Sequence, residues 1–283
     1  MAGVLLIVAL GLVAAAGAAP RTVVICAPGF PGDTEAARTT MEAFARAAAG
    51  AANWPEGSLN AVYHQTEQGG LERLAGDDAV LAIVPLPFFL RHGERFDLRP
   101  ALQIENTTGT EEIWSLAARR GAVASPEALG GWEITGRPGY APAFVRGPLL
   151  GAWGPLPAGV RITATASVLG ALRRAAAGEQ VAVLLDAAQT ASLPSLPFAG
   201  DLEIVATSGR LPGGVLCTVG DRLPAAEVDS MVAGLLDLHR SPAGEEALAA
   251  MRLKRFRKLD APALDAARRA YRAAGGGAAD PAP

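Results

Sequence analysis

The sequence is poor in several residue types that carry chemistry. Lysine occurs only at Lys254 and Lys258, and there are three histidines, two cysteines and 5% aromatic residues in 283. The net charge of −3 lacks the basic excess that nucleic-acid binding requires, so nucleic acid is not expected as a partner. No histidines stand at metal-ligand spacing and no Cys-x-x-Cys occurs, so neither a metal nor a cofactor is predicted.

The common catalytic motifs are also missing. The chain has no Gly-x-Ser-x-Gly elbow, no phosphate-binding Walker loop and no Gly-x-Gly-x-x-Gly. One acidic pair, Glu111-Glu112, follows a polar loop, where solvated side chains are expected rather than catalytic ones. These absences predict a protein that is not an enzyme.

The beginning of the chain has the pattern of an export signal. Val4 to Ala16 is apolar but too short to span a bilayer comfortably, and a small-x-small sequence ends at Ala18. We expect a signal peptide over residues 1–18 and a periplasmic, exported protein. An uncleaved anchor is the alternative, because the α-amino group is the only positive charge before the apolar run. No lipobox precedes Cys26, and Cys26 and Cys217 are expected as buried thiols rather than a disulfide.

Strand and helix patterns alternate along the rest of the chain. Such a rhythm predicts α/β architecture with parallel-type sheets and helices on both faces. The expected strands cover residues 21–27, 59–63, 79–84, 132–135, 160–165, 181–185, 202–206 and 215–219. Helices are expected between them, with Asp33 or Thr34 as one N-cap and a long helix over residues 139–152.

The alternation of strand and helix patterns is interrupted twice, and these interruptions divide the chain into two similar lobes. Lobe 1 is expected over residues 19–107 and 210–273 and lobe 2 over residues 108–209, followed by a disordered tail over 274–283. "GLERLAGDDAVLAIVPLPFF" and "GALRRAAAGEQVAVLLDAAQTA" echo each other as helix, glycine, polar pair and strand. A cleft between two such lobes is the expected ligand site.

Three stretches, taken in order, resemble the phosphonate/phosphite-binding subunits of ABC transporters, a branch of the type 2 periplasmic solute-binding proteins. They are "LAGDDAVLAIVPLPFFLRH", "GRPGYAPAFVRGPLLGAWG" and "MVAGLLDLHRSPAGEEALAAM". The resemblance implies a non-catalytic, two-lobed Venus-flytrap fold that closes on a small ligand and docks on a membrane permease. It also implies hinge strands near residues 104–113 and 206–215.

One loop departs from that family's pattern. Where the family carries hydroxyl side chains that hold an anion, this chain has Gly136, Arg137 and Pro138, and proline removes a backbone donor. Arg137 could bind an anion directly or point to solvent. Asp186, displaced from the family's acidic position, could contact ligand or cap the next helix. An ordinary phosphonate is therefore not the expected ligand.

The other loops expected at the cleft are apolar. Phe89 and Phe144 fit core positions, whereas Phe30, Phe88 and Tyr140 could line a site for an apolar, lipid-like ligand such as a sterol, which is an alternative to a small polar one. His64 could face the cleft or be solvated or in the core. The predicted ligand-binding residues are Phe30, Pro31, Asp33, Thr34, His64, Pro87, Phe88, Arg137, Tyr140, Thr165 and Asp186.

A dense basic run, Arg252 to Lys258, remains outside this scheme. A solvated surface segment is the expected structure, and a docking patch for an acidic partner or a membrane is the alternative. The predicted function is a monomeric solute-binding protein with a membrane permease as partner. A ligand-sensing accessory module is a further possibility.

Overall fold

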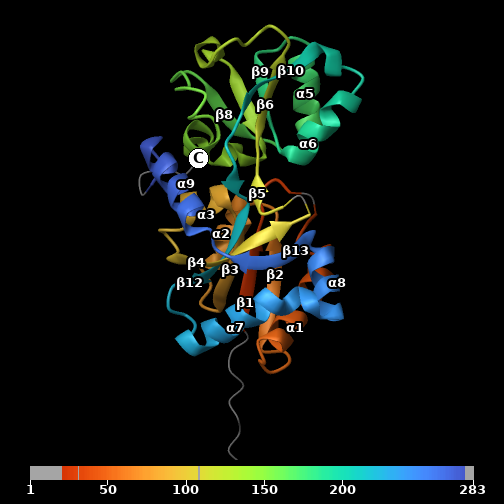
Figure 1. The fold of residues 1–283 in the computed structure, drawn as a ribbon, viewed down its shortest axis with the longest axis vertical. Helices are drawn as coiled ribbons and strands as arrows, with labels where there is room; N and C mark the ends of the chain where they lie inside the picture. Colours follow the sequence, from red (N-terminus) through yellow and green to blue (C-terminus); the bar gives the residue numbers. More distant parts are fainter. Residues whose placement is uncertain (1–20, 31, 108, 278–283) are drawn as a thin grey trace, which may run out of the picture.

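The computed structural model describes residues 21–30, 32–107 and 109–277. Its helices and strands form two lobes stacked along the long axis of the molecule, each built around its own sheet (Figure 1). The two-lobed α/β fold predicted from the sequence is confirmed. The expected signal peptide lies outside the described residues, as does most of the expected tail.

The sheet of the first lobe has six strands in the order β13-β4-β12-β3-β1-β2. β1 runs parallel to β2 and β3, whereas β12 runs antiparallel to β3 and β4, and β13 antiparallel to β4. The prediction of a parallel-type sheet is thus corrected to a mixed sheet, because β12 returns from the second lobe in the opposite direction and β13 adds antiparallel to β4. The bounds are β1 Arg21–Cys26, β2 Leu59–His64, β3 Ala79–Pro85, β4 Leu98–Asn106, β12 Gly214–Val219 and β13 Leu253–Lys258.

Helices cover both faces of this sheet because alternate side chains of the buried strands are apolar on either side. Val23 and Ile25 face α1, α7 and α8, while Val24 and Cys26 face α2 and α3. The bounds are α1 Arg38–Ala51, α2 Glu67–Leu74, α3 Leu86–His92, α7 Ala225–Asp237 and α8 Pro242–Ala250. α1 begins later than predicted, since Asp33 accepts from the amide of Ala36 in a separate turn, 2.8 Å away.

The sheet of the second lobe has five strands in the order β10-β6-β9-β7-β8. β7, β8 and β9 are parallel, and β6 and β10 are antiparallel additions. The bounds are β6 Ser115–Arg119, β7 Glu133–Gly136, β8 Arg161–Ala164, β9 Val181–Leu185, β10 Leu202–Thr207, α5 Val168–Ala176 and α6 Ala187–Ser192. Short 3-10 helices cover Pro126–Leu129, Leu193–Ser195, Ala199–Asp201 and, in the first lobe, Leu238–Arg240.

The helix predicted over residues 139–152 is broken in the structure. A 3-10 turn (Arg137–Tyr140) is followed by a single turn, α4 (Pro142–Phe144), and then by a π-helical turn (Val145–Leu149). Three prolines, Pro138, Pro142 and Pro148, each remove an amide donor, so a regular helix cannot continue. Sequence periodicity alone overestimated this helix.

Two short strands connect the lobes. β5 (Glu111–Glu112) pairs antiparallel with β11 (Leu211–Pro212), within the two segments expected as the hinge. The last helix, α9 (Ala261–Ala273), makes a further bridge, because Arg272 pairs with Glu94 of the first lobe while α9 also packs on α4 and the π-helical turn of the second. Although the sequence boundaries placed residues up to 273 in lobe 1, α9 therefore contacts both lobes (Figure 1).

The lobes share apolar packing. One buried cluster joins Val24 and Phe88 of the first lobe to Leu116 and Ile134 of the second. Both cysteines lie in this cluster as free, buried thiols, as predicted, and burial raises the pKa of Cys26 to about 12. Among the described residues, no helix has the length and apolar character required to cross a membrane.

Candidate functional site

The candidate site lies where the carboxyl ends of parallel strands meet the facing lobe. Arg137 directly follows β7, and Asp186 directly follows its neighbour β9. Phe30 comes from the loop after β1 of the first lobe, and Glu112 comes from the hinge strand β5. Ligands of open α/β sheets bind at this end of the strands, so the topology brings these side chains to the expected position.

An ion pair forms the centre of the site. The Nη2 of Arg137 donates to Oδ2 of Asp186, and only 15% and 19% of the two side chains are exposed. The second oxygen of Asp186 accepts from the Gln189 amide at 2.7 Å, and Gln189 in turn accepts from the Asp186 amide at 3.0 Å. Asp186 therefore caps α6, which is one of the two alternatives considered for it, while its other oxygen pairs with Arg137.

Two aromatic rings lie next to the guanidinium of Arg137. The guanidinium carbon of Arg137 lies 4.2 Å from the ring centroid of Phe30 and 5.9 Å from that of Trp114. Gly29 has φ +78, and a side chain there would lie 3.3 Å from Cγ of Arg137. The Nε–H of Arg137 is buried without an acceptor, although a buried donor normally has one. The unsatisfied donor marks a position where a ligand atom can bind.

Glu112 adds a second carboxyl group beside the pair. Its Oε2 accepts from Trp114 Nε1 at 3.2 Å. Burial raises the pKa of Glu112 to about 7, with Asp186 raising it further and Arg137 opposing the rise. Glu111 is exposed and pairs with Arg210 at 2.9 Å, as expected for a solvated side chain, whereas Glu112 is half-buried.

Tyr140 lies at the seam between the lobes. Its carbonyl accepts from Nη1 of Arg91 in α3, and Arg91 also pairs with Glu67 at 3.0 Å. His92 completes this cluster, with Nε2 at 2.6 Å from the same carboxylate. The Tyr140 hydroxyl is buried without a partner, and burial raises its pKa well above the usual value. The cluster ties the facing lobe surfaces together next to the site.

The glycine that follows Pro138 is required by close packing. A Cβ at Gly139 would lie 1.9 Å from the Thr163 carbonyl oxygen of β8. The turn therefore keeps glycine to pack against the strand, and "GRPGY" presents Arg137 rather than a row of backbone donors.

The other predicted site residues are dispersed. Phe88 is fully buried in the shared core, 4.9 Å from the His92 ring, and Pro87 is buried beside it in α3. Thr165 accepts from the Ser167 amide at 3.1 Å, in the turn before α5. His64 ends β2 against the start of α2, and burial lowers its pKa, with Arg73 adding to the effect.

Asp33 and Thr34 are exposed in the turn before α1, and Pro31 lies outside the described residues. Of the predicted residues, the structure brings Phe30, Arg137 and Asp186 together and places Tyr140 at the adjoining seam. The neighbouring Glu112, Trp114, Glu67 and Arg91 were not among the predicted residues. The one sequence signal for Glu112 and Trp114 was their position next to the expected hinge. The sequence carried no such signal for Glu67 and Arg91.

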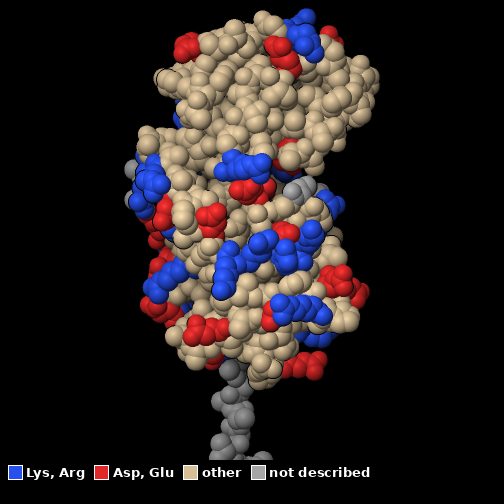
Figure 2. Space-filling view, viewed as in Figure 1, with Lys and Arg blue, Asp and Glu red and all other residues tan. Residues whose placement is uncertain are grey.

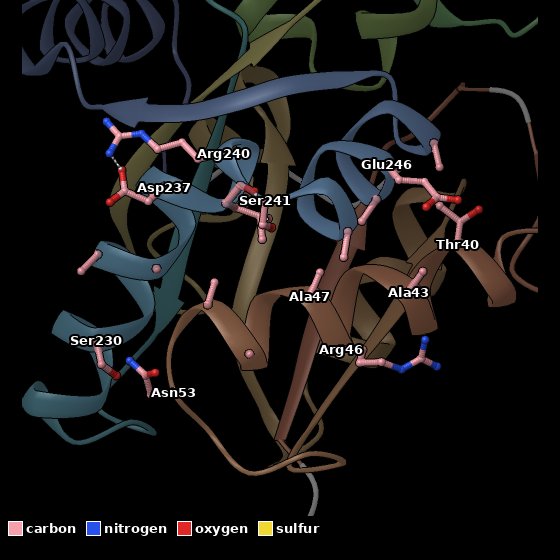
Figure 3. Close-up of a pocket in the computed structure, with 18 of the residues that line it drawn as sticks. Thr40, Ala43, Arg46, Ala47, Asn53, Ser230, Asp237, Arg240, Ser241 and Glu246 are labelled. Atoms are coloured by element: carbon pink, nitrogen blue, oxygen red, sulfur yellow. Dashed lines mark hydrogen bonds and ion pairs between the residues drawn. The ribbon is translucent and has the colours of Figure 1, made fainter.

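A surface groove lies elsewhere, on the first lobe. A groove of about 1100 Å³ runs between α1, α7 and α8. Figure 3 shows small side chains such as Ala43 and Ala47 along it, with the Asp237–Arg240 pair at one rim. Its lining lacks the converging charged and aromatic groups of the inter-lobe site. No group of three or more histidine, cysteine or acidic side chains suited to a metal occurs in the described part of the chain.

Comparison with known proteins supports the fold. No protein-family model matches the chain, and no curated protein matches it either. Among solved structures, a Xanthomonas citri protein bound to a chloride ion matches with a TM-score of 0.69 and 13% identity, over 90% of this chain and 98% of its own. The same protein bound to ATP gives a TM-score of 0.67 at 14% identity, again over 90% and 98%.

Two further matches are binding proteins for phosphonates. One is a binding-protein component of an ABC phosphonate transporter from Pseudomonas aeruginosa, with a TM-score of 0.61, 13% identity and coverage of 92% and 90%. The other is PhnD1 from Prochlorococcus marinus in complex with methylphosphonate, with a TM-score of 0.61, 11% identity and coverage of 92% and 100%. At such identities the likeness establishes the two-lobed solute-binding-protein fold and leaves the ligand to the chemistry of the site.

Proposed function

We propose that this chain is a non-catalytic solute-binding protein that captures a small ligand carrying both an acidic and a basic group. The ligand binds between the lobes and is delivered to a membrane transporter, and the chain is exported after removal of residues 1–18. The observation that carries the proposal is the Arg137–Asp186 ion pair, enclosed between the lobes by Phe30 and Trp114.

Charge balance favours a ligand of both signs. A purely anionic ligand that took Arg137 would leave Asp186 buried without its counter-charge, and a purely cationic one would do the same to Arg137. Removing one partner of a buried pair is costly, on the order of 3–5 kcal/mol. A zwitterion can separate the pair and give each side chain a new partner, so both charges stay compensated.

The surrounding groups suit the same ligand. The Arg137 Nε–H is available to an acidic group, and Phe30 and Trp114 can accept a cationic group on their ring faces. Glu112 provides an additional acceptor for an ammonium group. The apolar alternative loses one of its supporting side chains, because Phe88 lies in the core.

A thermal-shift screen of small zwitterions, matched anions and matched cations tests the proposal. We expect zwitterions to give the largest shifts, and the calorimetric affinity of the best one to fall at least about 30-fold in Arg137→Ala and in Asp186→Asn. Glu179→Gln, which removes an exposed ion pair with Arg174 in the same lobe, is the matched control and should bind normally. Hits confined to anions, or a lipid co-purifying with the protein, would contradict the proposed ligand class.

Hinge closure offers a test of the mechanism that does not depend on ligand class. Small-angle scattering should report compaction when a saturating zwitterion is added to protein freed of ligand by denaturation and refolding. Unchanged dimensions under saturation would argue against closure about β5 and β11.

A further inference from the structure

The basic run Arg252 to Lys258 is largely exposed, as expected for a surface segment, and residues 253–258 of it form a regular strand. It forms β13, the edge strand of the first-lobe sheet, which pairs with β4. Phe256 is buried against Phe44 of α1 and fixes one face of the strand to the core. The basic side chains of this run (the β13 row) are therefore carried along the edge of a sheet.

The row carries a large local excess of positive charge. Lys254, Arg255 and Arg257 all approach one carboxylate, Glu105, at 3.7, 2.7 and 3.1 Å. Within the described residues, Arg252 and Lys258 have no ion-pair partner. Five cations thus lie within seven consecutive residues, and three of them share one carboxylate, in a chain whose net charge is −3.

Two other surface arginines are each balanced by two carboxylates. Arg99 is paired with both Asp97 and Asp221, and Arg174 with both Glu133 and Glu179. The β13 row is also accessible, since 66% of the Lys254 side chain and 51% of Arg257 are exposed. Figure 2 shows lysine and arginine side chains in a row across the first lobe, where β13 lies in Figure 1.

We propose that the β13 row binds the anionic headgroups of a membrane surface. Unpaired lysine and arginine side chains gain free energy near anionic lipids, and the effect adds along a row of several charges. A single strand presents these charges along an extended surface rather than around an enclosed pocket, which suits a layer of headgroups better than one small anion. The contact would hold the first lobe at the membrane independently of what the inter-lobe site binds.

Vesicle co-sedimentation tests this surface. The chain without residues 1–18 is mixed with vesicles of phosphatidylglycerol and phosphatidylcholine in equal amounts, and with phosphatidylcholine alone. We expect binding only to the anionic vesicles, weakening steeply with added salt. Lys254→Glu/Lys258→Glu should lower the affinity at least about 25-fold, because two attractive contacts are lost and replaced by repulsion.

A matched variant distinguishes an effect of the β13 side chains on vesicle binding from an effect of the net charge of the chain. Arg161→Glu/Arg173→Glu makes the same change in charge at exposed positions of the second lobe and should bind vesicles within a few-fold of the natural chain. Circular dichroism melts establish that both variants fold. The proposal is overturned by equal binding to neutral vesicles, by equal losses in the two variants, or by binding of an acidic peptide without binding of anionic vesicles.

Discussion

Arg137 in the inter-lobe site and Arg255 on β13 both pair with a largely buried carboxylate, yet their surroundings differ. Arg137 and Asp186 are both enclosed, and they balance each other one to one beside Glu112, whose pKa is raised by burial. Glu105 is 8% exposed, whereas the three cations that share it reach into solvent. The comparison teaches that a buried cation needs one matching anion. A surplus of positive charge is tolerated where the cationic side chains reach solvent.

The largest effect is expected from breaking the balanced pair. Asp186→Asn keeps the helix cap but removes the charge, so Arg137 is left uncompensated and stability should fall by about 3 kcal/mol. Urea denaturation measures the loss. Glu179→Gln breaks an exposed pair with Arg174 and should cost less than about 1 kcal/mol. Equal losses in the two variants would show that the inter-lobe pair is not effectively buried.

The next effect concerns the proton on Glu112. Its folded pKa, about 7, lies above the ordinary 4.5, so the folded state holds a proton that the unfolded state releases between these values. Stability from this group is therefore full below pH 4.5 and is lost as pH rises towards 7. Glu112→Gln should be more stable than the natural chain at pH 8, by up to about 3 kcal/mol, and equally stable at pH 4. Denaturation curves at the two pH values test this, and a constant difference would contradict it.

A smaller effect is expected at the unbalanced cluster. Hydrogen bonds from Arg255 and then Arg257 lower the pKa of Glu105, so its contribution to stability is present above the ordinary pKa and lost as pH falls below it. Glu105→Gln should cost about 1–2 kcal/mol at neutral pH, because the charged acceptor of these bonds is removed. Urea denaturation of Glu35→Gln, at an exposed pair with Arg38, gives the control value near zero. Unchanged stability in Glu105→Gln would show that the cations of β13 do not need this carboxylate.

The smallest effect on stability is expected at the end of the row. Lys258 is exposed without an ion-pair partner, so Lys258→Ala should change stability by less than about 0.5 kcal/mol. Its affinity for anionic vesicles should nevertheless fall about five-fold, since one attractive charge is lost. A clear loss of stability would indicate a structural role for this lysine instead.

Much of the fold could be predicted from local patterns. The strands around Val24 and Val183 are continuous apolar runs between glycine and proline turns, and the hinge follows from two breaks in the alternation. The pattern failed where distant residues decide the structure. β13 becomes a strand because Phe256 reaches the core and β4 offers an edge, and neither fact is visible within "RLKRFRK".

The candidate site was predictable only in part for the same reason. Arg137 and Asp186 directly follow strands, and the carboxyl ends of neighbouring parallel strands converge, so their meeting is foreseeable. The partial burial of Glu112 depends on packing between the hinge and the lobes. The presence of an acidic residue in the sequence does not reveal that packing. Phe88 was predicted to line the ligand site but lies in the core. An aromatic residue that follows a strand can point into the core as readily as into a cleft.

Calorimetry on matched ligand pairs tests the central claim most directly. The pairs are β-alanine with propionate, taurine with ethanesulfonate, and 2-aminoethylphosphonate with ethylphosphonate, each differing by one ammonium group. The account predicts that the protein prefers the ammonium-bearing member and that Asp186→Asn abolishes the preference. Equal or tighter binding of the amine-free acids, unaffected by Asp186→Asn, would contradict a site built on the Arg137–Asp186 pair.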